Sequence, residues 1–321
     1  MDQSKKTPPF PPYLAIGFGI LAVSTASIFI RFAQAEVSSI VIAAYRLMIA
    51  ALVLTFPALH RYQVELKRLS RRDLALGFFS GVFLALHFAT WISSLEYTSV
   101  ASSVVLVTTT PLWVSLMAPV TIKESITKQV VFGMLVSLLG TVVIGLVDIC
   151  DQGGAFACPP LREFIQAQTF LGDFLALAGA LTAAGYILIG RNLRAKLSLI
   201  PYIFVVYGIA AVILTIMAVS SGENLTGFSS ESYLWLVLLA LIPQLLGHSS
   251  FNWALGYLPA AFVSITLLGE PIGTTILAAI FLKEVPGPIK LFGAILILGG
   301  ILIASLQPSK ISGERTSSPS Q

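Results

Sequence analysis

The chain has 321 residues, of which 56% are hydrophobic and 11% are charged, and its mean hydropathy is +0.89. A soluble globular domain of this length does not need so large an apolar fraction, so the composition indicates an integral membrane protein. The formal net charge of +4 is small and gives no indication of a nucleic-acid partner.

Apolar segments of about 20 residues, the length that crosses a bilayer core of about 30 Å as a helix, follow one another along the chain. The period-2 alternation of a transmembrane β-barrel is absent. Because lipid cannot satisfy backbone hydrogen bonds, we predict an all-α integral membrane protein with ten transmembrane helices. These helices are expected at residues 13–33, 38–57, 74–94, 99–120, 129–147, 170–190, 200–219, 232–253, 259–282 and 287–306.

The second half of the chain repeats the first. Residues 94–146 align with residues 254–306 without a gap, at a constant offset of 160 and with 12 identities in 53 positions. Apolar composition alone would give about four or five identities, so we infer an internal duplication. The matched pairs include Tyr97 and Tyr257, Pro111 and Pro271, Lys123 and Lys283, Glu124 and Glu284, Phe132 and Phe292, Gly133 and Gly293, and, outside this stretch, Arg31 and Arg191.

Basic residues favour one orientation of the helices. With the N-terminus inside the cell, 14 of the 19 Lys and Arg residues face the cytoplasm, four lie outside, and Arg46 lies within a helix. The positive-inside rule therefore places both termini in the cytoplasm, and we expect the plasma (inner) membrane. Because each half has five helices, an odd number, equivalent segments of the two halves cross the membrane in opposite directions. We therefore predict two inverted five-helix repeats, the architecture of alternating-access carriers.

The expected organisation has five parts: a disordered cytoplasmic N-terminus at 1–12, the first repeat at 13–147, an external loop at 148–169, the second repeat at 170–306, and a disordered cytoplasmic C-terminus at 307–321. Cys150 and Cys158 both fall in the external loop. An oxidising compartment would allow a disulfide between them, and two unpaired thiols fit the sequence equally well. No metal-ligand spacing accompanies them, so we expect no metal and no cofactor.

Several short motifs resemble those of the EamA-type branch of the drug/metabolite transporter superfamily. In the first half they are Tyr97-Thr98-Ser99-Val100-Ala101 leading into Pro111, then Lys123-Glu124 and Gly133. In the second half they are Gly172-Asp173, Glu270-Pro271, Glu284, Gly293 and the pair Gly299-Gly300. The resemblance covers nearly all of residues 13–306 and lies in the ensemble of motifs. It implies a ten-helix carrier of small metabolites, often an exporter, and it does not imply a particular substrate.

Arg46 lies eight residues into the second predicted helix. A charged residue inside the membrane costs about 2.5–3.5 kcal/mol on insertion scales, so it needs an explanation. A guanidinium at this depth would bind a carboxylate or phosphate through two parallel hydrogen bonds. The alternative is a structural role, in which Arg46 pairs with a helix carbonyl or with a carboxylate of the bundle.

Glu270 lies near the centre of the ninth predicted helix, directly before Pro271. The proline removes a helical donor and frees a carbonyl near residue 267, which makes the local backbone polar and bendable. Burial favours the neutral form of a carboxyl, which suits a residue that carries a coupling proton. The alternative is a static, protonated Glu270 that bonds to a neighbouring helix, although the equivalent first-half residue, Thr110, is uncharged.

Polar and aromatic side chains recur at helical spacing on two other predicted helices. Together with Trp113, Tyr186 and Tyr207 they would line a polar, aromatic cavity, or they would bond helices to one another without a substrate. The Ser and Thr residues between 98 and 110 are expected to serve close helix packing. The predicted substrate-binding residues are Arg46, His87, Trp91, Trp113, Gln244, His248 and Asn252, with Tyr186 and Tyr207 beside them and Glu270 as the proton-coupling residue.

These features favour a secondary active transporter that exports small metabolites by alternating access in exchange for protons. One alternative is an exchanger of anionic solutes such as organic phosphates or nucleotide-sugars, although Arg46 is the only cation expected within a helix. Another is a non-transporting membrane subunit. Nucleotide-binding and hydrolase motifs are absent, so neither ATP nor an enzymatic activity is expected. The expected partners are a small-molecule substrate and membrane lipid, in a monomer or homodimer.

The orientation can be tested with single cysteines and a membrane-impermeant thiol reagent. A cysteine at position 65 is expected to react only from the cytoplasm and one at position 228 only from outside. Because the repeats are inverted, cysteines at 125 and 285 should react from opposite sides. Reaction of positions 65 and 228 from the same side would contradict the ten-helix orientation.

Overall fold

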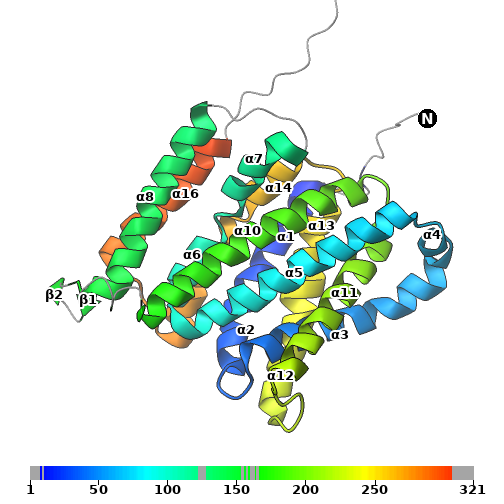
Figure 1. Cartoon of the computed structure of the whole chain (residues 1–321), viewed down its shortest axis with the longest axis horizontal. Coiled ribbons are helices and arrows are strands. Elements are labelled where there is room, and N and C mark those ends of the chain that lie inside the picture. Colours follow the sequence, from blue (N-terminus) through cyan, green and yellow to red (C-terminus); the bar gives the residue numbers. More distant parts are fainter. Residues whose placement is uncertain are drawn as a thin grey trace, which may run out of the picture.

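The computed structural model describes residues 8, 11–121, 128–152, 155–156, 158–159, 163 and 166–305. Its helices form one bundle (Figure 1), and the described part contains eight helical segments that are long and apolar enough to cross a membrane. Two shorter apolar helices, Val131–Ile144 and Pro288–Ile303, complete the set. The predicted all-α membrane fold is therefore confirmed. The Lys123-Glu124 turn, nearly all of the predicted N-terminal tail and the whole C-terminal tail lie outside the described residues.

The first repeat begins with α1 (Pro12–Ser24) and α2 (Ala26–Ala33), which form one segment with a break at Thr25. Its other helices are α3 (Ser39–Arg61), the short α4 (Gln63–Lys67), α5 (Arg71–Tyr97), α6 (Val100–Val107), α7 (Thr110–Thr121) and α8 (Lys128–Cys150). After α8, the two-residue strands β1 (Asp151–Gln152) and β2 (Ala155–Phe156) pair in antiparallel fashion. A disulfide joins Cys150 to Cys158 around this hairpin. The bridged alternative for these two cysteines is thus the one the structure contains.

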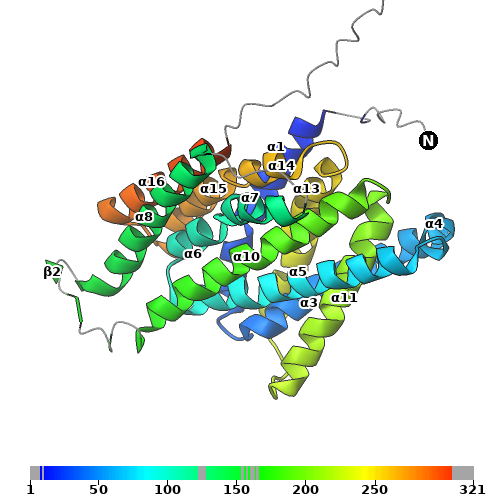
Figure 2. The same ribbon diagram turned by 45° about the horizontal axis from the view of Figure 1, so that its top comes forward.

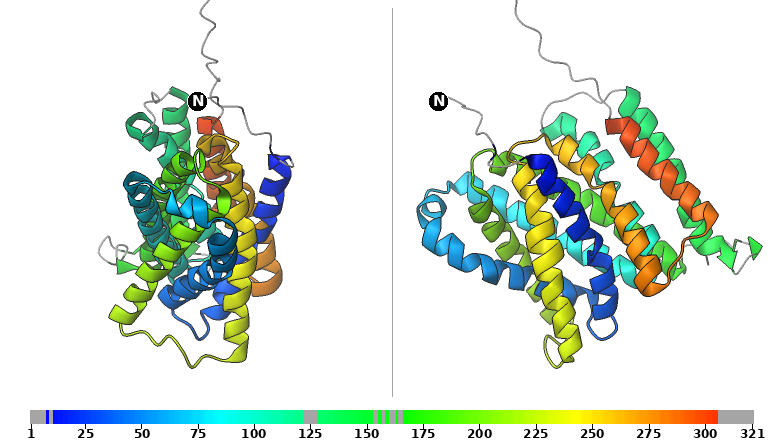
Figure 3. Two further views of the ribbon diagram at one scale, coloured as in Figure 1. Left: turned by 90° about the vertical axis from the view of Figure 1, so that its right-hand side faces the viewer. Right: turned by 180° about the vertical axis from the view of Figure 1, so that it is seen from behind.

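The second repeat begins with α10 (Gln168–Arg194) and α11 (Leu199–Ser220). The next segment is continuous but changes its winding, from α12 (Ser230–Leu239) through the π-helix η1 (Ala240–His248) to α13 (Ser249–Ala254). The remaining helices are α14 (Ala260–Thr266), α15 (Gly269–Leu277), the π-helical turn η2 (Ala278–Leu282) and α16 (Pro288–Ser305). Helix α1 begins and α16 ends at the same end of the bundle (Figure 3).

Two helices break at equivalent places in the two repeats. The fourth segment is interrupted between α6 and α7, and the ninth between α14 and α15. A proline follows each break by a few residues, Pro111 in one repeat and Pro271 in the other. Because proline cannot donate the backbone hydrogen bond of a regular helix, both segments change direction there. The breaks give residues 110 and 270 equivalent positions at the start of a new helix.

The pair α8 and α16 reveals the inverted symmetry most directly. The Ser137 hydroxyl donates to the Ile297 carbonyl at 3.1 Å, and these two positions are related by the offset of 160. On one side of this bond Gly140 lies against Gly293, and on the other side Gly300 lies against Gly133. These two contacts exchange under the repeat, so the pseudo-twofold axis passes close to Ser137. The glycines let the two backbones approach closely.

Long helices from both halves pack beside this pair. Helices α5 and α10 run side by side along most of their length (Figure 2), and α11 packs on α3 and α5. The inverted counterpart of the α5–α10 pair is the contact of α1 with η1. The α5–α10 contact is longer than the α1–η1 contact. Helices α5 and α10 are regular over 27 residues each, whereas α1 stops at Ser24 and η1 is π-helical.

Loop residues hold the helix ends of the opposite repeat. Glu36 accepts hydrogen bonds from the backbone N–H and hydroxyl of Ser229 and from the hydroxyl of Ser232, at the first turn of α12. The hydrogen bonds from Ser232 and Ser229 hold the pKa of the Glu36 carboxyl below its usual value. The equivalent position in the second repeat is Lys196, which pairs with Asp73 at the start of α5 at 3.3 Å. Glu36 and the repeat-related Lys196 therefore connect the two repeats at opposite ends of the bundle.

Adjacent glycines on α16 give a matched test of the helix pairing. A methyl group at Gly300 would lie 2.5 Å from the Gly133 carbonyl oxygen and would also overlap Ser137, whereas nothing lies within 4 Å of one at Gly299. We expect Gly300→Ala to lower the free energy of unfolding by about 1–3 kcal/mol, the usual cost of overpacking. Gly299→Ala should leave it unchanged or raise it. Thermal unfolding of the two purified variants makes the comparison, and equal melting temperatures would contradict the packing.

Candidate substrate site

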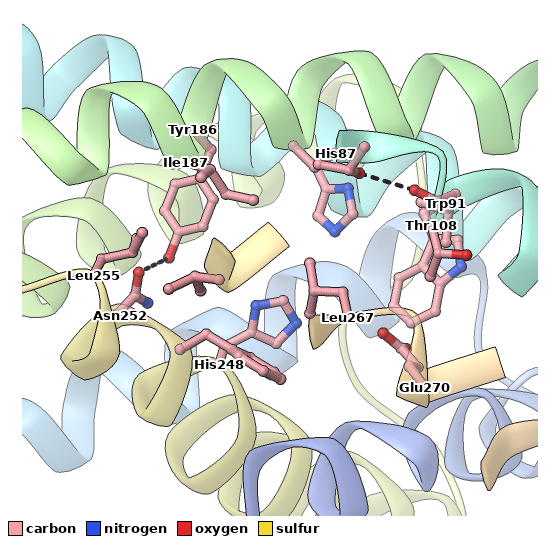
Figure 4. A pocket seen from close by; sticks show the side chains of 15 residues that line it. His87, Trp91, Thr108, Tyr186, Ile187, His248, Asn252, Leu255, Leu267 and Glu270 are labelled. Atoms are coloured by element: carbon pink, nitrogen blue, oxygen red, sulfur yellow. Dashed lines mark hydrogen bonds between the residues drawn. The ribbon is translucent and has the colours of Figure 1, made fainter. Parts of the chain in front are cut away.

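A small cavity of about 60 Å³ lies inside the bundle, between the two repeats (Figure 4). The first repeat contributes α5 and the broken α6–α7 segment, and the second contributes α10, η1, α13, α14 and α15. Five of the predicted site residues line the cavity: His87, Trp91, His248, Asn252 and Glu270. The remaining lining residues are Val107, Thr108, Thr110, Ala183, Tyr186, Ile187, Phe251, Leu255, Val263 and Leu267.

The helix break places Glu270 at the cavity wall. Its backbone N–H donates to the Leu267 carbonyl at 2.9 Å, in the tight turn that joins α14 to α15. The side chain is 9% exposed and points towards the space below Trp91 (Figure 4). Its repeat-related residue, Thr110, lines the same cavity, and the Thr110 hydroxyl donates to the Val107 carbonyl at 2.9 Å. The Ser and Thr run, for which we expected close helix packing rather than a site, contributes Thr108 and Thr110 to the cavity lining.

Arg46 lies behind this wall and is fully buried, as is its neighbour Gln244. The Arg46 Nε donates to Gln244 Oε1 at 2.7 Å. The guanidinium carbon lies 4.1 Å from the ring centroid of Phe88 and 5.9 Å from that of Trp91, so aromatic faces stabilise the cation. Neither Nη1 nor Nη2 has a hydrogen-bond acceptor among the described residues. Glu270, in its ionised form, would carry the charge opposite to that of Arg46, although the two side chains form no direct ion pair.

The π-helix η1 carries two of the predicted site residues of the second repeat and sets their positions. Pro243 lies inside it and removes one backbone donor, and such wide turns occur frequently at functional sites. Gln244 and His248 both lie on this segment, so their positions differ from those on an ideal α-helix. Nothing in the apolar periodicity of residues 232–253 distinguishes a π-turn from an α-turn, and Pro243 is the one signal that the sequence offers.

Two tyrosines fix the amide of Asn252. The Tyr186 hydroxyl donates to Asn252 Oδ1 at 2.7 Å, and Asn252 Nδ2 donates to the Tyr207 hydroxyl at 3.2 Å. Tyr186 itself lines the cavity, and Tyr207 is fully buried behind it. We expected both tyrosines to line the cavity; Tyr186 does, whereas Tyr207 lies behind Asn252 and supports its amide.

The two histidines approach each other from opposite repeats. His87 Nδ1 shares a hydrogen bond of 2.9 Å with the Gly179 carbonyl, and its ring stacks on Trp91 with centroids 5.9 Å apart. The ring of His248 lies 6.4 Å from that of His87 and 5.3 Å from that of Phe88. Aromatic faces thus form much of the wall around the space that Glu270 borders.

Trp113 does not lie in this site. It follows the break between α6 and α7, and it faces a separate apolar cavity of about 510 Å³ lined by Leu112, Leu138 and residues of α7, α8 and α10. The sequence grouped Trp113 with the other site residues by residue type, without a spacing argument. The break changes the direction of α7, so the substrate-binding role assigned to Trp113 has no support from the geometry.

A second, polar cavity of about 660 Å³ opens at the end of the bundle that holds Glu284. Here Arg31 of the first repeat pairs with Glu284 of the second at 3.3 Å and also donates to the Thr98 carbonyl. The other Glu284 oxygen accepts the Val100 N–H at 3.0 Å, at the start of α6. The repeat-related Arg191 instead donates to the Leu255 carbonyl within its own half.

No group of three or more His, Cys, Asp or Glu side chains among the described residues is placed to hold a metal ion. The geometry therefore provides a cavity with aromatic and aliphatic walls and one carboxyl group at its wall. One buried guanidinium lies behind that wall, and a cross-repeat ion pair lies at one end of the bundle. Such a site can bind and release a small molecule and a proton.

Comparisons with known proteins identify the family of the chain. The model of the EamA-like transporter family matches residues 11–146 and again residues 170–306. The uncharacterized transporter YdfC of Bacillus subtilis (strain 168) is 22% identical over 274 residues, which are 84% of this chain and 83% of that protein. The uncharacterized transporter YyaM of the same organism is 23% identical over 305 residues, 91% of this chain and 92% of that protein.

One solved crystal structure has the same fold, with a TM-score of 0.63 and 20% sequence identity over 92% of this chain and 96% of that one. Two matches to one family model, one in each half, agree with the internal repeat and with the apolar helices. The chain belongs to the EamA-like transporter family and is a multi-pass membrane transporter.

Proposed function

We propose that the protein is a secondary active transporter that exports small metabolites by alternating access, with Glu270 as its proton-coupling residue. The observation that carries this proposal is the cavity between the repeats, at whose wall Glu270 is buried. Carriers with inverted repeats bind their substrates at the repeat interface and expose them to each side in turn. The orientation that we propose has both termini in the cytoplasm and the Glu284 end outside.

The size of the cavity supports an alternating mechanism. Ligand sites in proteins usually enclose about 300–1,000 Å³, whereas this cavity has about 60 Å³. A metabolite therefore enters only if the repeats move apart. The breaks before Thr110 and Glu270 are natural hinges for such a movement, because backbone hydrogen bonding is already interrupted there.

Ties across the repeats at the Glu284 end are consistent with closure on that side. The Arg31–Glu284 ion pair and the Val100–Glu284 hydrogen bond join the ends of α2, α6 and η2. The inner parts of the α6 and α15–η2 segments border the central cavity. For a substrate to leave through the Glu284 end, we expect these bonds to open first.

The closure can be tested with a cysteine at Thr108, which lies in the cavity; the described native cysteines are bridged and do not react. We expect Arg31→Gln to raise the rate of labelling from outside by an impermeant maleimide about two- to fivefold, the range that a partly exposed ion pair supports. Glu284→Gln should act in the same way. Arg191→Gln is the repeat-matched control and should not raise external labelling. An equal increase in all three variants would contradict the closure.

The role of Glu270 can be tested by transport in liposomes, with a substrate found by thermal-shift screening of metabolites. Glu270→Gln imitates the protonated carboxyl, so it should abolish accumulation driven by a pH difference and remove the pH dependence of flux. Substrate binding should persist. Glu223→Gln, which changes an exposed carboxylate, is the control and should behave as the wild type. Concentration of substrate by Glu270→Gln under a pH difference would assign the coupling proton to another residue, with His87 and His248 as the next candidates.

A further inference from the structure

We propose that Glu270 and a carboxylate of the substrate alternate as the counter-ion of Arg46, so that the transporter moves a small monocarboxylate and one proton together. The inference rests on the proposed carrier function, and it names the substrate class and the sign of the proton coupling. It predicts that the substrate anion and the proton cross in the same direction, in contrast to the proton exchange expected from the sequence.

The first observation is a group of buried donors without acceptors. Arg46 Nη1 and Nη2 and Trp91 Nε1 have no hydrogen-bond partner in the described part of the chain. The Arg46 side chain is hydrogen-bonded to Gln244, and the centroid of the Trp91 ring lies 5.9 Å from the guanidinium carbon. All three atoms can only donate, so the group that satisfies them is rich in acceptors. A carboxylate fits, because its two oxygens match the paired guanidinium nitrogens.

The second observation is the charge around this group. Arg46 is fully buried, and no Lys or Arg is among the residues that line the cavity. Glu270 holds the one carboxyl group among those lining residues, and in its ionised form it would oppose the charge of Arg46. Both residues are described, yet they form no direct ion pair; the ion pairs found join Arg31 to Glu284 and Lys196 to Asp73. Arg46 thus has a counter-ion nearby while its two Nη atoms remain open to another acceptor.

Charge balance then links the two carboxylates. With Glu270 ionised and no ligand bound, the buried charges of Arg46 and Glu270 cancel. A bound substrate carboxylate would leave one excess negative charge in a low-dielectric site, which is unfavourable. Protonation of a Glu270 oxygen removes that excess, so the bound anion and the bound proton favour each other. When the anion and proton leave, Glu270 ionises again and compensates Arg46.

Other titratable groups face this site from neighbouring helices. They are His87, His248, Tyr186 and Tyr207 around the cavity and Arg31 towards the Glu284 end. A proton on either histidine would add a second cation beside Arg46 and leave four charges buried, whereas a proton on Glu270 leaves two. Glu270 is therefore the favoured acceptor.

The walls indicate the rest of the ligand. Phe88, Trp91 and the two histidine rings surround the guanidinium and the cavity, and Phe251, Val263 and Leu267 add apolar surface. A monocarboxylate with a small apolar or aromatic body would place its charge on Arg46 and its body against these side chains. Carried with one proton, it crosses without net charge, so export follows the outward gradient of the acid.

Proton uptake on ligand binding tests this coupling. Acetate, benzoate and indole-3-acetate are titrated into the purified wild-type protein between pH 6 and 9, in buffers of different ionisation enthalpy, with uncharged benzamide as the control. We expect thermal stabilisation and binding by benzoate but not by benzamide. At the pH of maximal effect, binding should take up about one proton per benzoate, and affinity should rise as pH falls, by up to about tenfold per unit.

Variants identify the groups. Glu270→Gln should bind benzoate without proton uptake and without pH dependence. Arg46→Lys should weaken binding, because Lys lacks the planar fork, and Arg46→Ala should weaken it further. His87→Gln and His248→Gln should still take up one proton per bound benzoate, as should the exposed Glu223→Gln control.

Several results would overturn the inference: no stabilisation by any carboxylate in the set, proton release or no proton exchange in the wild type, or unchanged uptake in Glu270→Gln. Proton uptake measured on the wild-type protein tests the inference even if a variant fails to fold. Benzoate flux in liposomes with proton release on binding would keep the carrier function and remove this inference. Binding with proton uptake but without flux would keep the link between the bound anion and the proton on Glu270 and would contradict the carrier function.

Discussion

A guanidinium buried between apolar helices has to be compensated, and the site is arranged around that requirement. Gln244 accepts one Arg46 hydrogen bond, Phe88 and Trp91 present their faces to the cation, and an ionised Glu270 would supply the opposite charge. Phe88 and Trp91 both belong to α5, whereas Gln244 belongs to η1 and Glu270 to α15. The buried charge on α3 thus relates α3 to three other helical segments. Any movement of the repeats changes this compensation, which makes Arg46 sensitive to the state of the transporter.

The scaffold is symmetric, whereas the site is not. Close contacts at Ser137 and its neighbouring glycines on α8 and α16, and the breaks in the fourth and ninth segments, follow the offset of 160. At the site the repeat-related residues differ: Glu270 corresponds to Thr110, and Gln244 corresponds to Leu84. A symmetric scaffold allows the two sides of the membrane to be served by equivalent movements. Under the proposed function, this single set of polar residues forms one substrate site rather than two.

Composition and the repeat predicted the membrane fold and the inverted halves, and the resemblance of short motifs indicated the family. Helical spacing grouped His87 with Trp91 and His248 with Asn252, since regular helices carry their faces predictably, and depth in the membrane singled out Glu270; all five lie at one cavity. Trp113, grouped with them by residue type alone, lies beyond the α6–α7 break and faces a different cavity. Helical spacing could not show the π-helix around Gln244, because a change from α to π winding depends on tertiary contacts that apolar periodicity does not record.

The protonation state of Glu270 is the central quantity, and infrared difference spectroscopy measures it directly. Benzoate binding to the wild-type protein is predicted to produce a positive band from a protonated carboxyl group, shifted by exchange into D₂O and unaffected by ¹³C in the benzoate. The band should be absent in Glu270→Gln. No such band, or a negative one that reports loss of a proton from Glu270, would contradict a guanidinium shared between this carboxyl and the substrate.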